Sequence, residues 1–551
     1  MDSVVRMDPA PITPAQLAQL LAAPDGTWPK RPWALLDVRE AGEYAAGHIP
    51  GATSLPRRML EFRIGDLVPC RDTSIVIYDA GKLAVQGEED RRAALAAATL
   101  RQSGWTRISV LIGGISACRA HGYVLAEGVN VPCKTFGERL LHDEGVPQIE
   151  PDMLAARLEA GERLVICDVR SPGEYAGAHL PGAYGTPSFD LSLHLFDLEQ
   201  SYQGIVVNCA GRTRSIIGAM TLKLLGARNL WALKNGTMGW ELSGRTLERN
   251  AARAPAAASE KSRAAVIARA EAMALSAGVG TATPDAVADL MADTAKSGAY
   301  LLDVRRLEEF TAGHISGAIF LAGGQAVQHA DEFVAVGTSP VLIVDDGDAR
   351  AWLTAYWYRR MGFSDVRVLN GGMPAWRESR RAWEIGRDRR PALGLAAAAA
   401  EVKSIDAHGL RRALDSGNPP LVIDVGTSRD FAAGHVPNAR WLPRGWLEDR
   451  IEHLAVAHGP CVIASRNQAQ ALLGAATLQA HGYTDIAVLE GGVNGWQAAG
   501  LDIAAGLPSG EIANDIVEPP YQQGLKSMQR YLDWEVRLLS PTGSDSDRVS
   551  P

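Results

Sequence analysis

The sequence predicts an α/β protein made of four tandem copies of one small unit, each a parallel sheet flanked by helices, followed by a helical C-terminal tail. Three observations support this fold class. Short apolar runs alternate with longer helical stretches, which is typical of βα units and a parallel sheet. The copies recur at a domain-sized interval, which excludes a solenoid of small stacked repeats. Four segments also align: LLDVREAGEYAAGHIPGA (35–52), VICDVRSPGEYAGAHLPGA (165–183), LLDVRRLEEFTAGHISGA (301–318) and VIDVGTSRDFAAGHVPNA (422–439).

The elements of one copy follow in a fixed order. A helix with proline near its start, at Thr13-Pro14 in the first copy, precedes an apolar run that ends in Asp-Val. A helical Ala/Leu-rich stretch follows the second run, and the third run ends in a glycine pair or its relic (VLIGG, ALKNG, VLNGG, VLEGG). Ligands of open α/β sheets bind beyond the carboxyl ends of the strands, so the residue that ends the second run is the predicted site of chemistry. The four second runs are IVIYD (75–79), IVVNC (205–209), VLIVD (341–345) and CVIAS (461–465).

These repeats divide the chain into four predicted domains and a tail. The Ala-rich segments 250–280 and 391–402 are interpreted as helical connectors. We expect 521–539 to form an amphipathic helix that docks on a domain, and the polar end of the chain after it to be disordered. The predicted boundaries are 8–130, 145–250, 280–390 and 400–505 for the domains and 506–551 for the tail.

Composition and charge exclude several classes of protein. With 46% apolar and 21% charged residues, the 551-residue chain is neither fibrous nor disordered as a whole. A net charge of −8 without a Lys/Arg run argues against a nucleic-acid or anionic-membrane partner. There is no secretory signal pattern and no uninterrupted apolar stretch of about 18 residues. Six scattered cysteines without metal-ligand spacing favour a reduced, cytoplasmic protein, with no metal and no cofactor expected.

Cys209 is the predicted nucleophile. It ends the second run of the second copy and is followed by a short loop and a helix, so loop amides and the helix N-terminus favour its thiolate. Arg212 and Arg214 add positive charge. A fall in pKa from roughly 8.5 to roughly 6.5 would raise the thiolate fraction at pH 7 from about 3% to about 75%. The predicted substrate-binding residues are Ala210, Gly211, Arg212, Thr213, Arg214 and Ser215.

The equivalent position in the other three copies holds Asp79, Asp345 and Ser465, so we expect these copies to be catalytically inactive. The other cysteines are interpreted as buried small hydrophobes. A resolving role for Cys167, which precedes Asp168 on its strand, is the alternative for that residue.

Several recurring residues are interpreted as structural. Asp168, Arg170 and Glu174 recur in the first and third copies, and we expect an Arg–Glu pair that fixes the loop after the strand. In the fourth copy Gly426 and Asp430 replace both members of that pair. A packing role is also predicted for the recurring histidines and tryptophans, since they occur in active and inactive copies alike: His48, His179, His314, His435, Trp240, Trp376 and Trp496.

These motifs resemble the rhodanese family of sulfurtransferases over residues of about 10–505. The marks are the Asp-Val-Arg strand end, the Gly-His-Ile/Leu-Pro-Gly-Ala segment, the Cys-initiated loop and the terminal Gly-Gly…Trp. The loop from Cys209 to Arg214 has six residues, as in rhodanese-like enzymes. Related phosphatase domains have seven, and Ser215 stands where their Cys-x5-Arg pattern has arginine.

The resemblance implies a reaction as well as a fold. Cys209 would take a sulfane sulfur from thiosulfate or a related donor, carry it as a persulfide and pass it to cyanide or a thiol. The implied partners are a small-molecule donor and acceptor, with a protein acceptor as a further option. Thiosulfate is preferred because its two negative charges suit Arg212 and Arg214. The loop matches neither the Cys-Gly-Ser-Gly-Val-Thr of mercaptopyruvate-specific relatives nor the Cys-Arg-Lys-Gly-Val-Thr of thiosulfate-preferring ones, so a persulfidated small thiol stays open.

Two other functions remain as alternatives. The chain could be a scaffold or sulfur-relay protein whose inactive domains bind a partner, because three of the four sites lack the nucleophile. Less favoured is a Cys-based phosphatase or arsenate reductase, since cysteine loops also bind tetrahedral oxyanions.

Overall fold

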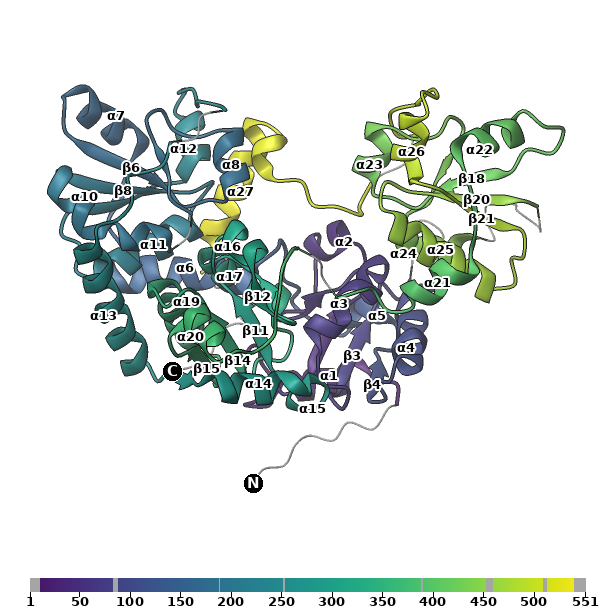
Figure 1. Cartoon of the computed structure of the whole chain (residues 1–551), viewed down its shortest axis with the longest axis horizontal. Coiled ribbons are helices and arrows are strands. Elements are labelled where there is room, and N and C mark those ends of the chain that lie inside the picture. The colour runs from purple at the N-terminus through teal and green to yellow at the C-terminus, as the bar shows by residue number, and fades with distance from the viewer. Residues whose placement is uncertain are drawn as a thin grey trace. The chain divides into compact units, whose positions relative to one another are not determined.

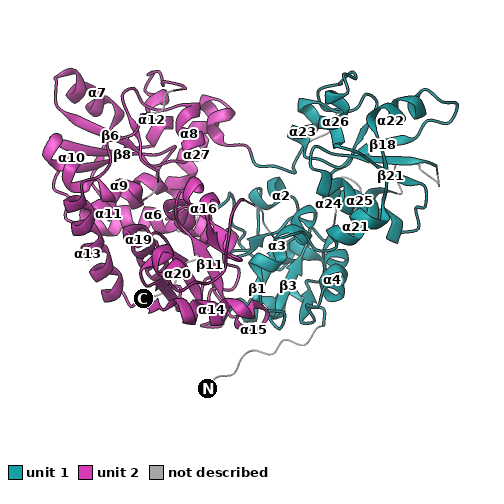
Figure 2. Cartoon of the chain, viewed as in Figure 1, with its two compact units in different colours: residues 1–22, 33–129, 389–517 teal, residues 23–32, 130–388, 518–551 magenta. Residues whose placement is uncertain are grey.

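The computed structural model describes residues 10–82, 88–187, 189–250, 253–387, 390–451, 459–508 and 513–539. The chain forms two compact units (Figures 1 and 2). One comprises 1–22, 33–129 and 389–517, and so holds most of the first and fourth predicted domains. The other comprises 23–32, 130–388 and 518–551, and holds the second domain, the third domain and the tail. The predicted end of the chain, 540–551, lies outside the described residues.

Four parallel sheets with one shared strand order confirm the predicted fold class. In the second domain the order is β5-β9-β8-β6-β7, and the third and fourth domains repeat it as β10-β15-β14-β11-β13 and β17-β21-β20-β18-β19. The first domain forms β2-β1-β3-β4, and an isolated parallel bridge between Ile12 and Leu111 takes the place of the fifth strand. The second-run strand is therefore flanked on both sides in every domain, and its carboxyl end lies at the middle of the sheet edge.

The central strands are apolar because helices cover both faces of each sheet. All five residues of β8 and all four of β3, β14 and β20 are buried. The elements of the first domain are α1 (Pro14–Ala22), β1 (Ala34–Asp37), α2 (Ala41–Ala45), β2 (Thr53–Ser54), the 3₁₀ helix η1 (Arg57–Met59), α3 (Leu60–Leu67), β3 (Ile75–Tyr78), α4 (Arg92–Gln102), β4 (Ile108–Val110) and α5 (Gly114–Ala120).

The fourth domain packs on the first within their unit. Two buried ion pairs join them, Arg57 to Glu448 at 2.9 Å and Arg444 to Glu61 at 2.7 Å. The fourth domain comprises α21 (Leu395–Glu401), β17 (Lys403–Ile405), α22 (Ala407–Leu414), β18 (Leu421–Asp424), α23 (Ser428–Ala433), β19 (Arg440–Trp441), α24 (Arg444–Arg450), β20 (Cys461–Ala464), α25 (Gln468–Ala480), β21 (Ile486–Leu489) and α26 (Gly492–Ala498).

The second domain is preceded by a helix, α6 (Val131–Glu144), which the sequence analysis assigned to no domain and which packs against α11. The domain itself comprises β5 (Gln148–Ile149), α7 (Pro151–Glu159), β6 (Leu164–Asp168), α8 (Pro172–Gly177), β7 (Tyr184–Gly185), α9 (Asp190–Leu193), α10 (Leu195–Ser201), β8 (Gly204–Asn208), α11 (Thr213–Leu224), β9 (Leu230–Leu233) and α12 (Gly236–Leu242).

The third domain follows the long helix α13 (Glu260–Ser276). Its elements are β10 (Gly280–Ala282), α14 (Pro284–Ala292), α15 (Thr294–Ser297), β11 (Tyr300–Asp303), α16 (Leu307–Ala312), β12 (His314–Ile315), β13 (Ile319–Phe320), α17 (Gly323–Gln328), α18 (Ala330–Phe333), β14 (Val341–Val344), α19 (Ala349–Met361), β15 (Val366–Leu369), α20 (Gly372–Glu378) and β16 (Trp383–Glu384). The short strands β12 and β16 pair antiparallel, apart from the main sheet.

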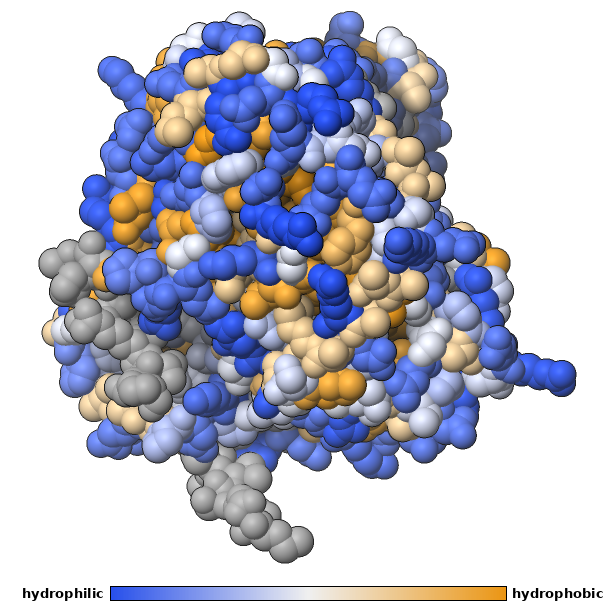
Figure 3. Space-filling view, turned by 90° about the vertical axis from the view of Figure 1, so that its left-hand side faces the viewer, coloured by the Kyte–Doolittle hydropathy of each residue, from blue (hydrophilic) through white to orange (hydrophobic). Residues whose placement is uncertain are grey.

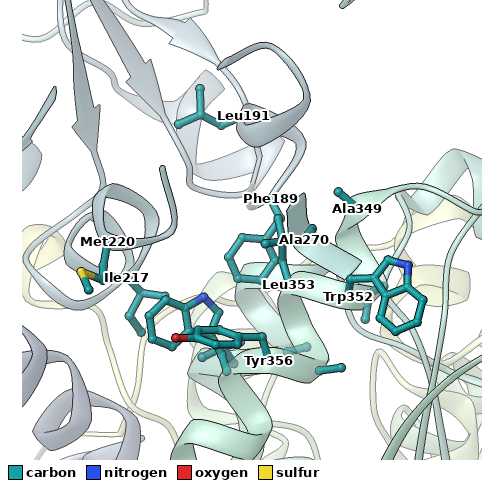
Figure 4. Close-up of a cluster of buried hydrophobic side chains, with 14 of the residues drawn as sticks. Phe189, Leu191, Ile217, Met220, Ala270, Ala349, Trp352, Leu353 and Tyr356 are labelled. Atoms are coloured by element: carbon teal, nitrogen blue, oxygen red, sulfur yellow. The ribbon is translucent and has the colours of Figure 1, made fainter. Parts of the chain in front are cut away.

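One hydrophobic core spans the second and third domains. Figure 4 shows Ile217 and Met220 of α11 together with Leu353 and Tyr356 of α19. The indole Nε1 of Trp357 also donates a hydrogen bond to Oγ1 of Thr221 at 2.9 Å. The helix α13, interpreted from the sequence as a connector, buries Val266, Ala270 and Ala274 in this core. Helix α13 is therefore part of the fold of this unit rather than a simple linker.

The tail forms the expected helix. A 3₁₀ turn, η3 (Pro520–Gln522), leads into α27 (Leu525–Arg537), which lies beside α12 and α6 and buries Met528, Leu532 and Glu535 (yellow in Figure 1). In the part of the chain that is described, no helix has both the length and the apolar character needed to cross a membrane. The face seen in Figure 3 shows apolar residues in patches between hydrophilic ones.

Candidate active site

Cys209 lies where the central strand β8 ends, in the loop that leads into α11. Its side chain is buried, with 2% of the residue exposed. The thiol donates a hydrogen bond to Oγ of Ser215 at 3.4 Å, and that hydroxyl donates to the carbonyl of Arg212 at 2.8 Å. The loop thus closes on itself around the sulfur, and it brings together the predicted residues from Cys209 to Ser215.

A glycine behind the loop holds it in place. Gly236 has φ +56°, and a Cβ on it would lie 2.2 Å from the carbonyl oxygen of Cys209. The amides of Thr237 and Met238 bind the carbonyls of Cys209 and Ala210 at 2.9 and 3.1 Å. The other domains repeat this close approach through the second glycine of each pair, which explains that motif: Gly114 against Asp79, Gly372 against Asp345 and Gly492 against Ser465.

Arg214 is bound to a carboxylate. Its two terminal nitrogens each donate to Glu174 of α8 at 2.8 Å. The first and third domains, which have no cysteine at the equivalent position, repeat this contact as Arg92 with Glu43 and Arg350 with Glu309. The arrangement corrects the predicted Arg170–Glu174 pair: Arg170 binds Asp168 instead, at 2.7 Å, because Asp168 lies two residues before it at the strand end.

Arg212 is also bound to a carboxylate. Its Nε and Nη2 donate to Glu138 of α6 at 2.7 Å, and its Nη1 donates to Oδ1 of Asn235 at 3.0 Å. The helix approaches closely because residue 137 is glycine, on which a Cβ would lie 3.0 Å from the Thr213 side chain. The sequence analysis expected two arginines available to an anionic donor, but Glu138 and Glu174 already bind both guanidinium groups.

The predicted fall in the pKa of Cys209 is wrong for this arrangement. Burial raises the pKa of the thiol, and Arg214 and the Ser215 hydrogen bonds lower it only in part. The sequence analysis counted the amides and arginines but not the loss of contact with water, which disfavours the thiolate.

The C-terminal helix covers this loop. Glu535 of α27, 2% exposed, accepts hydrogen bonds through Oε1 from Thr213 at 3.3 Å and from the Tyr531 hydroxyl at 3.1 Å. Met528 and Leu532 pack on Met238. The amphipathic pattern of 521–539 predicted a docking helix, but nothing in the sequence indicated that its partner would be the Cys209 loop.

In the first and third domains, an aspartate stands at the position of Cys209 and its carboxylate binds loop amides. In the third, the Asp345 carboxylate accepts hydrogen bonds from the amides of Gly347 and Ala351 at 2.9 and 2.8 Å. Burial and the neighbouring Asp348 raise the pKa of Asp345. The amide of Ala351 is equivalent to that of Ser215, which binds Cys209. In both domains, the side chain of the first loop residue therefore binds amides of the loop and of the following helix.

The remaining recurring residues are structural. Each of the four histidines places Nδ1 at 2.8–3.1 Å from the carbonyl four residues earlier and stacks on the aromatic ring of that residue, which confirms the predicted packing role. Trp240, Trp376 and Trp496 are buried. Cys167 is buried as well, and burial raises the pKa of its thiol to about 12.

Comparison with known proteins agrees with this geometry. A family model described as "Rhodanese-like domain" matches residues 13–121, 150–243, 283–379 and 406–499. A thiosulfate sulfurtransferase of Azotobacter vinelandii is 32% identical over 200 residues, which cover 32% of this chain and 68% of that protein. One of Pseudomonas aeruginosa is 30% identical over a stretch of the same length and coverage.

Among solved structures, a thiosulfate sulfurtransferase from Pseudomonas aeruginosa aligns with a TM-score of 0.82 and 34% identity, covering 96% of this chain and 97% of that one. Four matched segments, each folded as a parallel sheet in one shared strand order, establish that the chain belongs to the rhodanese family and is built from four rhodanese-like domains.

Proposed function

We propose that the chain is a sulfurtransferase that moves a sulfane sulfur from thiosulfate, or a related donor, through a persulfide on Cys209 to cyanide or a thiol. The observation that carries the proposal is the placement of Cys209: among the four equivalent strand-end positions, this one holds sulfur, within a loop whose Ser215 amide and hydroxyl face it. The similarity to proteins named thiosulfate sulfurtransferase supports the same reaction.

The proposed reaction has two steps. Cys209 gives up its proton, its thiolate attacks the outer sulfur of thiosulfate, the S–S bond of the donor breaks, and a new S–S bond forms on the protein. The thiol proton leaves with sulfite as hydrogen sulfite, and the protein keeps a persulfide anion. Cyanide then attacks the outer sulfur, thiocyanate leaves, and Cys209 takes up a proton. This is covalent, two-stage catalysis.

The loop from Ala210 to Ser215 is the proposed binding site for the sulfur anion at each stage. Backbone amides and the Ser215 hydroxyl would stabilise it, because the guanidinium groups of Arg212 and Arg214 are held by glutamates. Asp168, Arg170 and Glu174 would act by supporting the loop. Asn208 links them to the nucleophile strand through its hydrogen bond to Asp168 at 2.9 Å.

The proposal is tested by mass spectrometry of the full chain after thiosulfate treatment. We expect the Cys209 peptide to gain the mass of one sulfur atom and to lose it on addition of cyanide, with thiocyanate released. Cys209→Ser should neither gain the sulfur nor turn over, and Cys461→Ser is the matched control that should keep both. Turnover by Cys209→Ser would contradict the assignment. Persulfide formation without turnover would favour the relay function, and hydrolysis of p-nitrophenyl phosphate the phosphatase.

A further inference from the structure

Glu535 is an unusual residue to find over a sulfur-binding loop. It comes from the C-terminal helix α27, beyond the last segment that the family model matches. Its Oε2 is buried and has no hydrogen-bond partner. That oxygen lies 3.2 Å from the point where a Cβ of Gly211 would be, next to the Met238 methyl group and the Tyr531 ring at 2.9 and 3.6 Å from the same point. The middle residue of the active loop therefore faces a carboxyl oxygen.

The charges around the loop explain what this carboxyl changes. Arg212 is paired with Glu138 and Arg214 with Glu174. The third nearby cation is Lys134 of α6, which is buried beside the Tyr531 and Trp534 rings at 5.1 and 4.9 Å. Glu535 is the carboxylate with the largest electrostatic effect on it. Asp331 and Glu332 act on Lys134 as well. An ionised Glu535 therefore adds negative charge beside a loop whose two arginines are already paired with carboxylates.

The geometry points to Glu535 as a specificity-determining residue of the Cys209 site, whose ionised carboxylate discriminates against sulfur donors according to their negative charge. The inference rests on the proposed sulfur transfer and deepens it, because it concerns the class of donor that the same site accepts. A dianion that approaches the loop meets the unpartnered oxygen of Glu535, whereas a donor with one charge fewer meets half of that repulsion.

The discrimination depends on pH. Burial raises the pKa of Glu535, Lys134 lowers it, and Glu138 raises it. The charged and titratable groups around the carboxyl are Cys133, Lys134 and Glu138 on α6, Arg212 and Cys209 in the loop, and Tyr531 on its own helix. As pH rises through the pKa of Glu535, the carboxyl gains its charge, and use of a dianionic donor should fall relative to use of a monoanionic one.

The test compares two donors that deliver the same sulfane sulfur: thiosulfate, with two negative charges, and methanethiosulfonate, with one. The quantity measured is the ratio of their kcat/KM values as a function of pH, in the full chain. Ionisation of Cys209 affects both donors and cancels in the ratio. Glu535→Gln keeps an oxygen for Thr213 and Tyr531 and removes the charge.

At a pH above the pKa of Glu535, we expect Glu535→Gln to raise kcat/KM by about tenfold for thiosulfate and about threefold for methanethiosulfonate, because the Coulomb energy scales with donor charge. The pH dependence of the ratio should disappear. Glu535→Asp should keep that dependence. Asp533→Asn removes an exposed charge from the same helix and should leave the ratio unchanged.

An unchanged ratio in Glu535→Gln, with Cys209 still loaded by both donors, overturns the inference and leaves the proposed function intact. An equal fall for both donors also overturns it, since Glu535 would then only pack the loop. Failure of the wild-type chain to form a Cys209 persulfide with either donor instead overturns the proposed function.

Discussion

At the residue scale, the role of Arg214 depends on the carboxylate that it binds. The sequence placed this arginine in the nucleophile loop and assigned it to the donor. In the structure it binds Glu174 through two hydrogen bonds, and Arg350 binds Glu309 in an inactive domain. A contact that recurs where there is no nucleophile supports the loop rather than the substrate. Arg214 also lowers the pKa of Cys209, because the guanidinium group that supports the loop lies near the thiol.

The Arg214–Glu174 pair predicts acid-dependent stability. Burial raises the pKa of Glu174, but Arg214 and Ser171 outweigh this and hold it at about 2, below its ordinary value of 4.5. A depressed pKa contributes stability above the unfolded-state value and loses it as pH falls toward 2. The loss is at most about 3 kcal/mol. We expect the melting temperature of the wild-type chain to fall more steeply between about pH 5 and pH 3 than that of Arg214→Met, measured by calorimetry.

Arg350→Met is the comparison variant, since it removes the same kind of pair from a domain without a nucleophile. It should lose stability yet keep the kcat of sulfur transfer, whereas Arg214→Met should lose part of both. Equal slopes of melting temperature against pH for wild type and Arg214→Met would show that the pair contributes nothing to acid sensitivity.

At the scale of elements, the loop is positioned by helices that lie on every side of it. α12 binds its carbonyls, α8 supplies Glu174, α6 supplies Glu138 and α27 supplies Glu535. Of these, α6 and α27 lie outside the segments that match the family model. The close approach of α12 depends on a glycine at positive φ, so the element and the loop are coupled through one residue.

Gly236→Ala should therefore displace the loop. Its φ of +56° is unfavourable for alanine, and the added Cβ would lie 2.2 Å from the carbonyl of Cys209. A shift of about 1 Å in a reacting group can lower a rate by about 100-fold, and we expect a loss of that order in kcat/KM for thiosulfate. Steady-state kinetics with a parallel measurement of melting temperature checks this.

Gly492→Ala is the matched control. It has φ +57° and would bring a Cβ to 1.9 Å from the carbonyl of Ser465, in a domain without a sulfur nucleophile. Similar destabilisation with unchanged kinetics is expected. If Gly236→Ala kept wild-type kcat/KM, the glycine would not be what positions the nucleophile.

At the scale of the whole molecule, the domains pack in pairs within each compact unit. The second and third domains share one core that includes α13, and the first and fourth are joined by buried ion pairs. The domain that holds Cys209 therefore packs on a neighbour that has aspartate at the equivalent position, and we expect the third domain to stabilise the second.

Leu353→Ala tests this shared core. Leu353 lies on α19 of the third domain, is fully buried, and packs in the core that contains Ile217 and Met220 of the second. Such a truncation costs about 2–5 kcal/mol. We expect faster hydrogen exchange of the β8 amides, although β8 belongs to the other domain. Leu447→Ala, at an equally buried leucine of the fourth domain, is the control and should leave hydrogen exchange of β8 unchanged. If Leu353→Ala also left it unchanged, the second and third domains would be independently stable.

A nucleophile alone should not make the fourth domain active. In a Cys209→Ser background, we expect Ser465→Cys to turn over at less than about a tenth of the wild-type rate. A tenfold lower rate corresponds to an activation free energy about 1.4 kcal/mol higher. A left-handed glycine at position 211 is not the reason, since Gly211 is not among the glycines at positive φ. Instead, Asn467 already accepts hydrogen bonds from the amides in this place. Its side-chain Oδ1 binds the amides of Ala469 and Gln470, and its backbone carbonyl binds the amide of Ala471, which is equivalent to the Ser215 amide. Thiosulfate-dependent turnover above that level would contradict the inactive assignment.

The sequence by itself determined the fold class, the four-fold repeat and the position of Cys209. These follow from local signals of a few adjacent residues: apolar strand runs and turn residues that occur in all four copies, and a cysteine at the strand end of one copy. The glycine pairs were visible as a pattern, but their close contact with the loop carbonyls was not.

Tertiary structure alone decided the chemistry around Cys209. Glu138 and Glu535 come from helices far from Cys209 in sequence, and their side chains reach the loop only after the chain has folded. Lys134 lies beside the ring of Tyr531, a residue of the helix that carries Glu535. The direction of the pKa shift of Cys209 also depends on burial, which the letters near Cys209 do not record. Charge and desolvation act through space, so residues distant along the chain set the electrostatics of a loop whose own sequence suggested two available arginines and a thiolate.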